Sequence, residues 1–149
     1  MKIGICGCAG RMGRMLVEAV LDGEGASLAG GSERAESPAL GQDLGNLIGR
    51  APLGQFVTGC VSGLFDVSDA VIDFTTPAAT VAHAALAAEQ GKVLVVGTTG
   101  LSSDDEAALA AAARRTVIVH APNFSVGVTL LTALTERAAA ILGPDYDIE

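Results

Sequence analysis

The chain has 149 residues, which predicts one domain with a hydrophobic core. Half of the residues are hydrophobic and 19 are glycine, but only 3% are aromatic, so the core must consist of small aliphatic side chains. A formal net charge of −8 argues against binding to nucleic acid or to an anionic membrane, because no basic stripe is present to neutralise phosphates. An anionic ligand would have to be held by local groups.

Nothing in the sequence predicts a membrane span or a secretion signal. No apolar run approaches the roughly 18 residues of a membrane-spanning helix. Arg11 and Arg14 interrupt the region in which a signal peptide would need its apolar segment. We therefore expect a cytoplasmic protein.

The three cysteines, Cys6, Cys8 and Cys60, have neither the spacing of a redox pair nor that of a zinc site. We expect all of them to be buried as small apolar side chains, and we predict no bound metal.

Hydrophobic periodicity in the first part of the chain predicts a strand over about 2–6, a helix over about 11–21 and a strand over about 26–30. These elements form one βαβ unit. The next segment, 37–65, is interrupted by glycine and proline. Within it only 56–60 has the pattern of a short strand, and the remainder is predicted as loops and short helical turns.

The second half alternates more regularly between strands and helices. Its short aliphatic strands show no polar alternation, which indicates burial on both faces, and the helical connections make the sheet parallel. Pro77 suits a first helical turn, and Gly91 and Gly143 suit helix ends. The sequence therefore predicts a doubly wound α/β domain. The expected strands are 70–74, 92–96 and 116–120, and the expected helices are 77–90, 103–115 and 126–142.

A glycine-rich turn follows the first strand. Gly7, Gly10 and Gly13 have the spacing G-x-x-G-x-x-G, a relative of the dinucleotide-binding pattern G-x-G-x-x-G. The first glycine allows a tight turn, the second a close approach to a pyrophosphate, and the third close packing of helix on strand. A lone match is a weak signal in a glycine-rich chain, where such residues can simply cap a helix. The strand before the turn and the helix after it favour a dinucleotide site.

Glu33 and Arg34 stand side by side after the second strand. An acidic residue here accepts hydrogen bonds from the ribose hydroxyls of NAD, whereas a basic one pairs with the 2′-phosphate of NADP. We expect the cofactor to be NADH or NADPH, with Arg11 and Arg34 as candidate phosphate contacts. The alternative is that Glu33 and Arg34 are a solvated loop pair.

The loops after three later strands offer small residues with hydroxyl or amide groups. They are 75–77, 97–100 and 121–125. Because the carboxyl ends of parallel strands meet at one edge of a sheet, we expect these loops to line one cleft, where they could orient a nicotinamide carboxamide or a substrate carboxylate. Any one of them alone is more often helix-capping chemistry, but their convergence favours a site.

Together these motifs resemble the 4-hydroxy-tetrahydrodipicolinate reductase family, also called dihydrodipicolinate reductase, of bacterial lysine and diaminopimelate synthesis. The matching stretches are GCAGRMGR, SER followed by LGQDLG, VIDFTTP, VVGTTG and APNFSVGV, which cover nearly the whole chain in the family's order. The resemblance implies a Rossmann-type domain and an oxidoreductase. Its reaction would transfer hydride from NADH or NADPH to a small cyclic imine dicarboxylate derived from 4-hydroxy-tetrahydrodipicolinate, yielding tetrahydrodipicolinate.

The resemblance also implies roles for individual residues. Residues 7–12 would hold the pyrophosphate, Glu33 and Arg34 the adenosine ribose, and 97–99 with 121–124 the nicotinamide, while Thr99 would also lie near the substrate. The expected cofactor-binding residues are Gly7, Cys8, Ala9, Gly10, Arg11, Met12, Gly13, Glu33, Arg34, Phe74, Thr75, Gly97, Thr98, Thr99, Ala121, Pro122, Asn123 and Phe124.

By the same resemblance, 1–125 form the dinucleotide-binding domain, and 126–149 form the first helix and the start of a substrate domain. In the family, the segment similar to DYDIE runs on into two adjacent histidines, a lysine and P-S-G-T, which supply the proton donor and bind the dicarboxylate. None of these lies within the 149 residues. We therefore expect no catalytic residue here and little or no turnover from these residues alone. The family forms homotetramers, and the oligomeric state of this chain stays open.

The two histidines do not replace that chemistry. His83 lies within the helix 77–90 and is expected on its surface or in its packing, and His120 ends a strand near the cleft. A dinucleotide-binding module without turnover is one alternative function. Another is an unrelated dehydrogenase of amino acids or sugars, against which GTTG and PNFSVGV argue.

The helix 126–142 carries an apolar stripe that would be exposed without a partner and would favour self-association. Its members are Leu130, Leu131, Leu134, Ile141 and Leu142.

Overall fold

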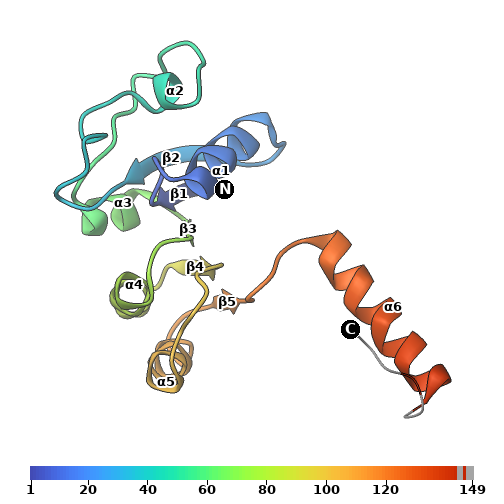
Figure 1. Ribbon diagram of the computed structural model, residues 1–149. Coiled ribbons are helices and arrows are strands. Elements are labelled where there is room, and N and C mark those ends of the chain that lie inside the picture. Colours follow the sequence, from blue (N-terminus) through green and yellow to red (C-terminus); the bar gives the residue numbers. More distant parts are fainter. Residues whose placement is uncertain (144–145, 147–149) are drawn as a thin grey trace.

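The computed structural model describes residues 1–143 and 146. Its centre is a parallel sheet of five strands in the order β2-β1-β3-β4-β5 (Figure 1). The chain builds the sheet outward from β1 to β2 and then in the opposite direction from β3 to β5, which confirms the doubly wound α/β fold. The strands are β1 (Lys2–Cys6), β2 (Ser27–Ser32), β3 (Ala70–Asp73), β4 (Val93–Val96) and β5 (Ile118–His120). The helices are α1 (Arg11–Asp22), α2 (Leu44–Leu47), α3 (Val61–Val67), α4 (Pro77–Gln90), α5 (Ser103–Ala112) and α6 (Val126–Leu142).

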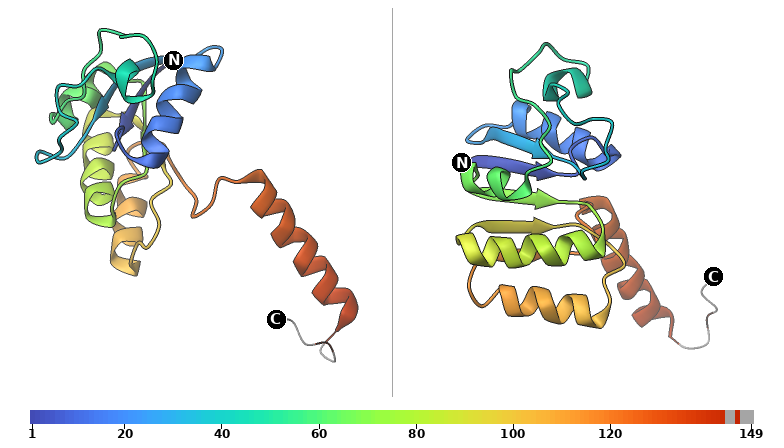
Figure 2. Two further views of the ribbon diagram at one scale, coloured as in Figure 1. Left: turned by 45° about the horizontal axis from the view of Figure 1, so that its top comes forward. Right: turned by 90° about the vertical axis from the view of Figure 1, so that its left-hand side faces the viewer.

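Helices cover both faces of the sheet. α1 packs on one face, where Val17 and Val20 are buried. α3, α4 and α5 cover the opposite face (Figure 2, right). On this face α4 buries Ala84, Ala87 and Ala88, whose small side chains let the helix approach the strands closely. The small aliphatic core that the composition predicts is confirmed.

Most predicted boundaries agree with the structure. The ranges 2–6, 77–90 and 126–142 are confirmed to the residue. α5 ends at Ala112 rather than at 115, because the chain tightens there: Arg114 and Arg115 donate their N–H groups to carbonyls only three residues back.

The short strand predicted at 56–60 is wrong. This segment takes part only in isolated bridges. The buried carboxylate of Asp43 accepts hydrogen bonds from the backbone N–H groups of Gly45, Leu53 and Gly54 at 2.8 to 2.9 Å. These three bonds close the chain into a compact loop before the segment, which then pairs with β2 only at its end, through the parallel bridge between Ser32 and Thr58.

Two expectations about burial are also wrong. Cys6 and Cys8 are buried as predicted, but Cys60 is exposed, because it precedes α3 and its sulfur accepts a hydrogen bond from Gly63 N–H.

β5 is not buried on both faces: Val119 is 45% exposed. β5 is an edge strand, and in the described part of the chain the helices that cover this end of the sheet lie on one face only.

α6 stands apart from the sheet (Figures 1 and 2). The structure describes all of α6, and none of its residues is buried. The predicted apolar stripe is therefore exposed, and Leu131, for example, is 63% accessible. Among the described residues, no helix is both long enough and apolar enough to cross a membrane.

Candidate functional site

The glycine turn lies where the strand order reverses, between β1 and β3. Gly7 has φ +71°, a conformation that L side chains rarely adopt, and its N–H donates to the Ser32 carbonyl at 2.9 Å. Gly13 packs directly under the turn. A Cβ there would overlap the Gly7 carbonyl oxygen and lie 2.7 Å from Cys8 Cα. The predicted tight turn and close helix packing are thus confirmed, and the pyrophosphate contact of Gly10 stays a prediction.

Two helix N-termini at this edge have no side-chain cap. Gly10, which precedes α1, has no side chain, and the side chain of Thr76, which precedes α4, makes no hydrogen bond to the helix. Neither helix has an acidic residue in its first turn. α5 differs, because Ser102 and Asp105 form a capping box at its start. Uncapped N–H groups and the partial positive charge of a helix N-terminus favour an anion at α1 and α4.

A groove of about 640 Å³ runs over these N-termini. It is bounded by the glycine turn, the end of β2, part of the 34–47 segment and the loop after β3. A second cavity of about 560 Å³ adjoins it, sharing Phe74 and Thr75. The two cavities therefore form one elongated site along the carboxyl edge of the sheet, where open parallel sheets bind ligands.

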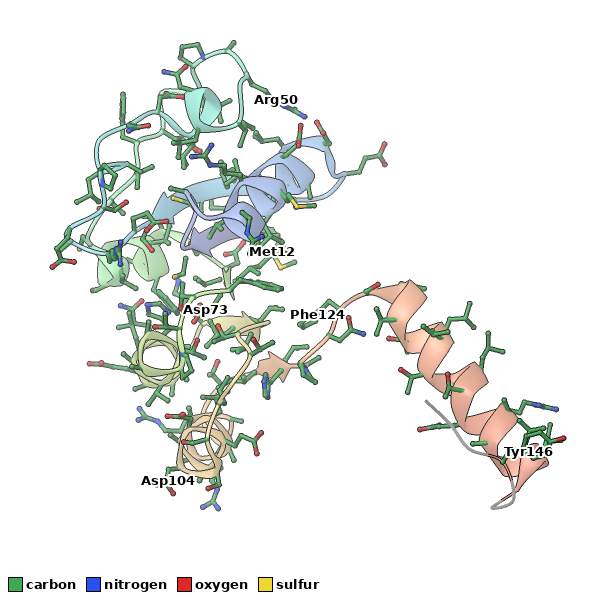
Figure 3. The ribbon with its side chains drawn as sticks, viewed as in Figure 1. Met12, Arg50, Asp73, Asp104, Phe124 and Tyr146 are labelled. Carbon is green, nitrogen blue, oxygen red and sulfur yellow. The ribbon has the colours of Figure 1, made fainter. Side chains whose placement is uncertain are left out.

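Most of the predicted site residues line these two cavities. The first contains Gly7, Ala9, Gly10, Glu33, Arg34, Phe74 and Thr75. The second contains Met12, Phe74, Thr75, Gly97, Thr98, Thr99, Pro122, Asn123 and Phe124. Figure 3 labels Met12 at the start of α1 and Phe124 in the segment after β5, which bring the ends of two distant elements to the second cavity.

Four predicted residues line neither cavity: Cys8, Arg11, Gly13 and Ala121. Cys8 and Gly13 are buried behind the turn. Burial and the charge of Glu33 raise the pKa of the Cys8 thiol to about 12, so the thiol stays protonated and unreactive. The basic side chain of α1 that lines the groove is Arg14, whose Nε donates to the Ala9 carbonyl at 2.9 Å, whereas Arg11 is exposed outside it.

Glu33 reaches from the end of β2 to the glycine turn. Its Oε1 accepts a hydrogen bond from Ala9 N–H at 2.9 Å. Arg34 follows it, exposed along the wall of the same groove. The acidic and basic residues that the sequence pairs therefore lie at one end of the site.

A buried polar network supports the opposite wall. Asp73, at the end of β3, is fully buried, and its Oδ2 lies 2.8 Å from His83 Nδ1 of α4. Burial lowers the pKa of His83, but its hydrogen bonds with Asp73 and Cys6 and the negative charge of Asp73 outweigh this effect and raise the pKa to about 10. His83 is therefore an imidazolium at neutral pH.

The sequence patterns predict no role for Asp73, and they predict His83 on the helix surface or in its packing, without a role at the site. Two signals were available. Asp73 is a carboxylate inside an otherwise aliphatic strand, and Thr80 and His83 share the inward face of α4 with Ala84 and Ala87 at helical spacing. His120, the other histidine, is exposed and lines neither cavity.

An aromatic pair shapes the second cavity. The rings of Phe74 and Phe124 have centroids 6.0 Å apart at 52°. Phe74 packs against Gly97, where a Cβ would overlap its ring.

The described residues hold no group of three or more potential metal ligands.

Fold and site together define a class: a doubly wound parallel domain with a glycine turn at its switch point, the architecture of dinucleotide-binding domains. The family model described as "Dihydrodipicolinate reductase, N-terminus" matches residues 1–124, and the chain belongs to this family.

Relatives named 4-hydroxy-tetrahydrodipicolinate reductase match along the whole chain. The protein from Ruegeria sp. is 50% identical over 147 residues, which is 99% of this chain and 55% of the relative. That from Dinoroseobacter shibae is 52% identical with the same coverage. The chain spans about half the length of these relatives.

Solved structures show the same fold. The dipicolinate-bound dihydrodipicolinate reductase from Paenisporosarcina sp. TG-14 has a TM-score of 0.73 and 24% identity, over 94% of this chain and 54% of that one. An oxidoreductase from Agrobacterium radiobacter, in complex with NAD⁺, L-tartaric acid and magnesium, has a TM-score of 0.64 and 21% identity, over 80% of this chain and 35% of that one.

Proposed function

We propose that this protein is an NAD(P)H-dependent 4-hydroxy-tetrahydrodipicolinate reductase of lysine and diaminopimelate synthesis. The observation that carries the proposal is the pair of adjoining cavities at the switch point, in a chain that belongs to this family. The reaction would reduce a cyclic imine dicarboxylate to tetrahydrodipicolinate. The nicotinamide supplies the hydride when it is bound, and the protein binds and orients it.

The residues of the groove fit an extended dinucleotide. At one end, Glu33 and Arg34 would hold the adenosine ribose. In the middle, the turn from Gly7 to Gly10 and the uncapped start of α1 would hold the pyrophosphate, because a backbone without Cβ atoms allows close approach. At the other end, the hydroxyls of Thr98 and Thr99 and the segment 121–124 would orient the nicotinamide, with Thr99 next to the substrate.

The domain division also belongs to this proposal. Residues 1–125 would be the dinucleotide-binding domain, and 126–149 the start of the substrate domain, since α6 leaves the sheet and buries no residue. We assign neither histidine to proton transfer, because His83 lines only the first cavity, away from the proposed nicotinamide end, and His120 lines neither. We therefore expect little or no turnover from these 149 residues alone.

The test is calorimetric titration of the purified 149-residue chain with NADH and NADPH, followed by substrate-dependent loss of absorbance at 340 nm. We expect binding without turnover. Turnover would mean that a proton donor lies within these residues, and absence of binding to either nucleotide would contradict the proposal.

Two variants test whether Glu33 and Arg34 bind the adenosine ribose. Arg34→Ala should weaken NADPH about tenfold and leave NADH nearly unchanged, because only NADPH offers a 2′-phosphate to a charged donor. Glu33→Ala should weaken NADH, and Glu36→Ala is its matched control, an exposed glutamate that does not line the groove. Equal losses from Glu33→Ala and Glu36→Ala would remove Glu33 from the site.

A further inference from the structure

We propose that Asp73 and His83 are positioning residues of the dinucleotide groove. Their buried ion pair holds Thr75 and Thr98 in place. These two threonines in turn fix the position of the loops after β3 and β4, which line the two cavities. This inference rests on the proposed function, because the ligand whose binding it explains is the dinucleotide.

The contacts of Asp73 join three parts of the molecule. Its Oδ2 lies 2.8 Å from His83 Nδ1 on α4, while its Oδ1 accepts from both the hydroxyl and the backbone N–H of Thr75, at 2.6 and 3.0 Å. One carboxylate therefore fixes the side chain and the backbone of Thr75, one of the two residues that line both cavities. His83 itself lies at the floor of the first cavity.

The network continues into the loop after β4. Thr75 N–H also donates to Thr98 Oγ1 at 3.0 Å, and the hydroxyl of the fully buried Thr80 donates to the same oxygen at 2.8 Å. Thr98 is 3% exposed and lines the second cavity. The loops after β3 and β4 are thus fastened to each other and to α4 through the hydroxyl of Thr98, and the backbone bond from Gly97 N–H to the Asp73 carbonyl, at 2.9 Å, adds to this connection.

Charge gives the pair a second effect on the groove. The bound pyrophosphate is an anion, and a buried carboxylate beside its site would repel it. The imidazolium of His83 neutralises the charge of Asp73. The carboxylate can therefore accept hydrogen bonds from Thr75 without giving this side of the groove a net negative charge. Removing one partner alone leaves an uncompensated charge, which costs more than the loss of the pair as a whole.

Four variants separate positioning from plain stability. His83→Asn keeps a donor near Nδ1 but removes the positive charge. Asp73→Asn keeps the acceptor for Thr75 but removes the negative charge, and the double variant restores neutrality. Ser68→Ala is the matched control: it deletes a buried hydroxyl that donates to the Leu64 carbonyl at 2.6 Å, before the start of β3 and so at the opposite edge of the sheet.

The measurement is the Kd of NADH and of adenosine 2′-monophosphate, which has no 5′-phosphate and so reaches only the Glu33 and Arg34 end, with the thermal midpoint recorded for every variant. We expect His83→Asn to weaken NADH about tenfold and adenosine 2′-monophosphate less than about twofold, and the double variant to regain much of the NADH affinity. Ser68→Ala should lower the thermal midpoint without changing either Kd.

If the charge variants do not fold, Thr98→Val replaces them, because it removes the shared hydroxyl at nearly constant volume; it should also weaken NADH selectively. A parallel loss of both affinities would show a merely structural role and overturn the inference. So would unchanged affinities in folded variants of a chain that binds NADH. Failure of the unaltered chain to bind NADH or NADPH would instead overturn the proposed function, and this inference with it.

Discussion

The two walls of the groove are built in different ways. On the β1 side, the shape depends on glycines: because Gly7 and Gly13 have no Cβ atom, the backbone packs directly on backbone. On the β3 side, it depends on polar side chains that are present, above all Asp73 and His83. Packed backbone cannot move aside for an added atom and does not respond to pH. A polar network can rearrange, but it responds to the charge of each member.

The largest effect is expected from Gly13→Ala. The new Cβ meets the carbonyl of Gly7 and the backbone of Cys8, which have no free space to move into. We expect a loss of about 3 kcal/mol in the free energy of unfolding, measured by urea denaturation. Gly10→Ala is the control, because its Cβ would lie 3.2 Å from the same carbonyl oxygen and should cost far less. Similar losses of unfolding free energy for both variants would contradict the close backbone packing at Gly13.

The wall on the β3 side should respond to pH. The pKa of His83 is raised in the folded protein from its ordinary value of 6.5 to about 10, so its stabilising effect is complete below pH 6.5 and is lost as the pH rises through 10. We expect the urea midpoint to fall across this window. His83→Asn should lack this part of the pH dependence, and identical profiles for the two proteins would refute the assignment.

A smaller loss of stability is expected from a substitution in the second cavity, where the added Cβ would contact a side chain instead of backbone. Gly97→Ala would place a Cβ against the ring of Phe74, which can rotate away. We expect a loss of about 1 kcal/mol in thermal denaturation, together with weaker nucleotide binding. Phe74→Leu in the same chain should recover part of the stability, and an added loss instead would show that the ring is not the obstacle.

The smallest effect is expected in α6, which forms neither wall. Leu131→Ser changes a side chain that is 63% exposed, so the unfolding free energy should stay within about 0.5 kcal/mol. Leu94→Ala, at a fully buried position of β4, should cost about 2–5 kcal/mol by the same measurement. Sedimentation of Leu131→Ser tests the stripe as well: we expect weaker self-association than in the unaltered chain. A large loss of stability from Leu131→Ser would show that α6 packs on the sheet in solution.

The sequence by itself determined the order and type of the main elements and the place of the glycine turn. Periodicity within β1, α4 and α6 is a local property, and the roles of Gly7 and Gly13 follow from their spacing next to one strand and one helix. Because parallel strands end at one edge, the loops of the site could also be predicted before their contacts were known.

Only the tertiary structure decided which side chains meet. Asp73 and His83 lie in different elements, and their pairing depends on how α4 is rotated against the sheet. The rotation of α1 likewise places Arg14 rather than Arg11 in the groove. Val119 is exposed because the described helices near β5 cover only one face of the sheet. A sequence pattern shows which residues share a face, but what that face contacts is determined by packing between elements that are distant in the chain.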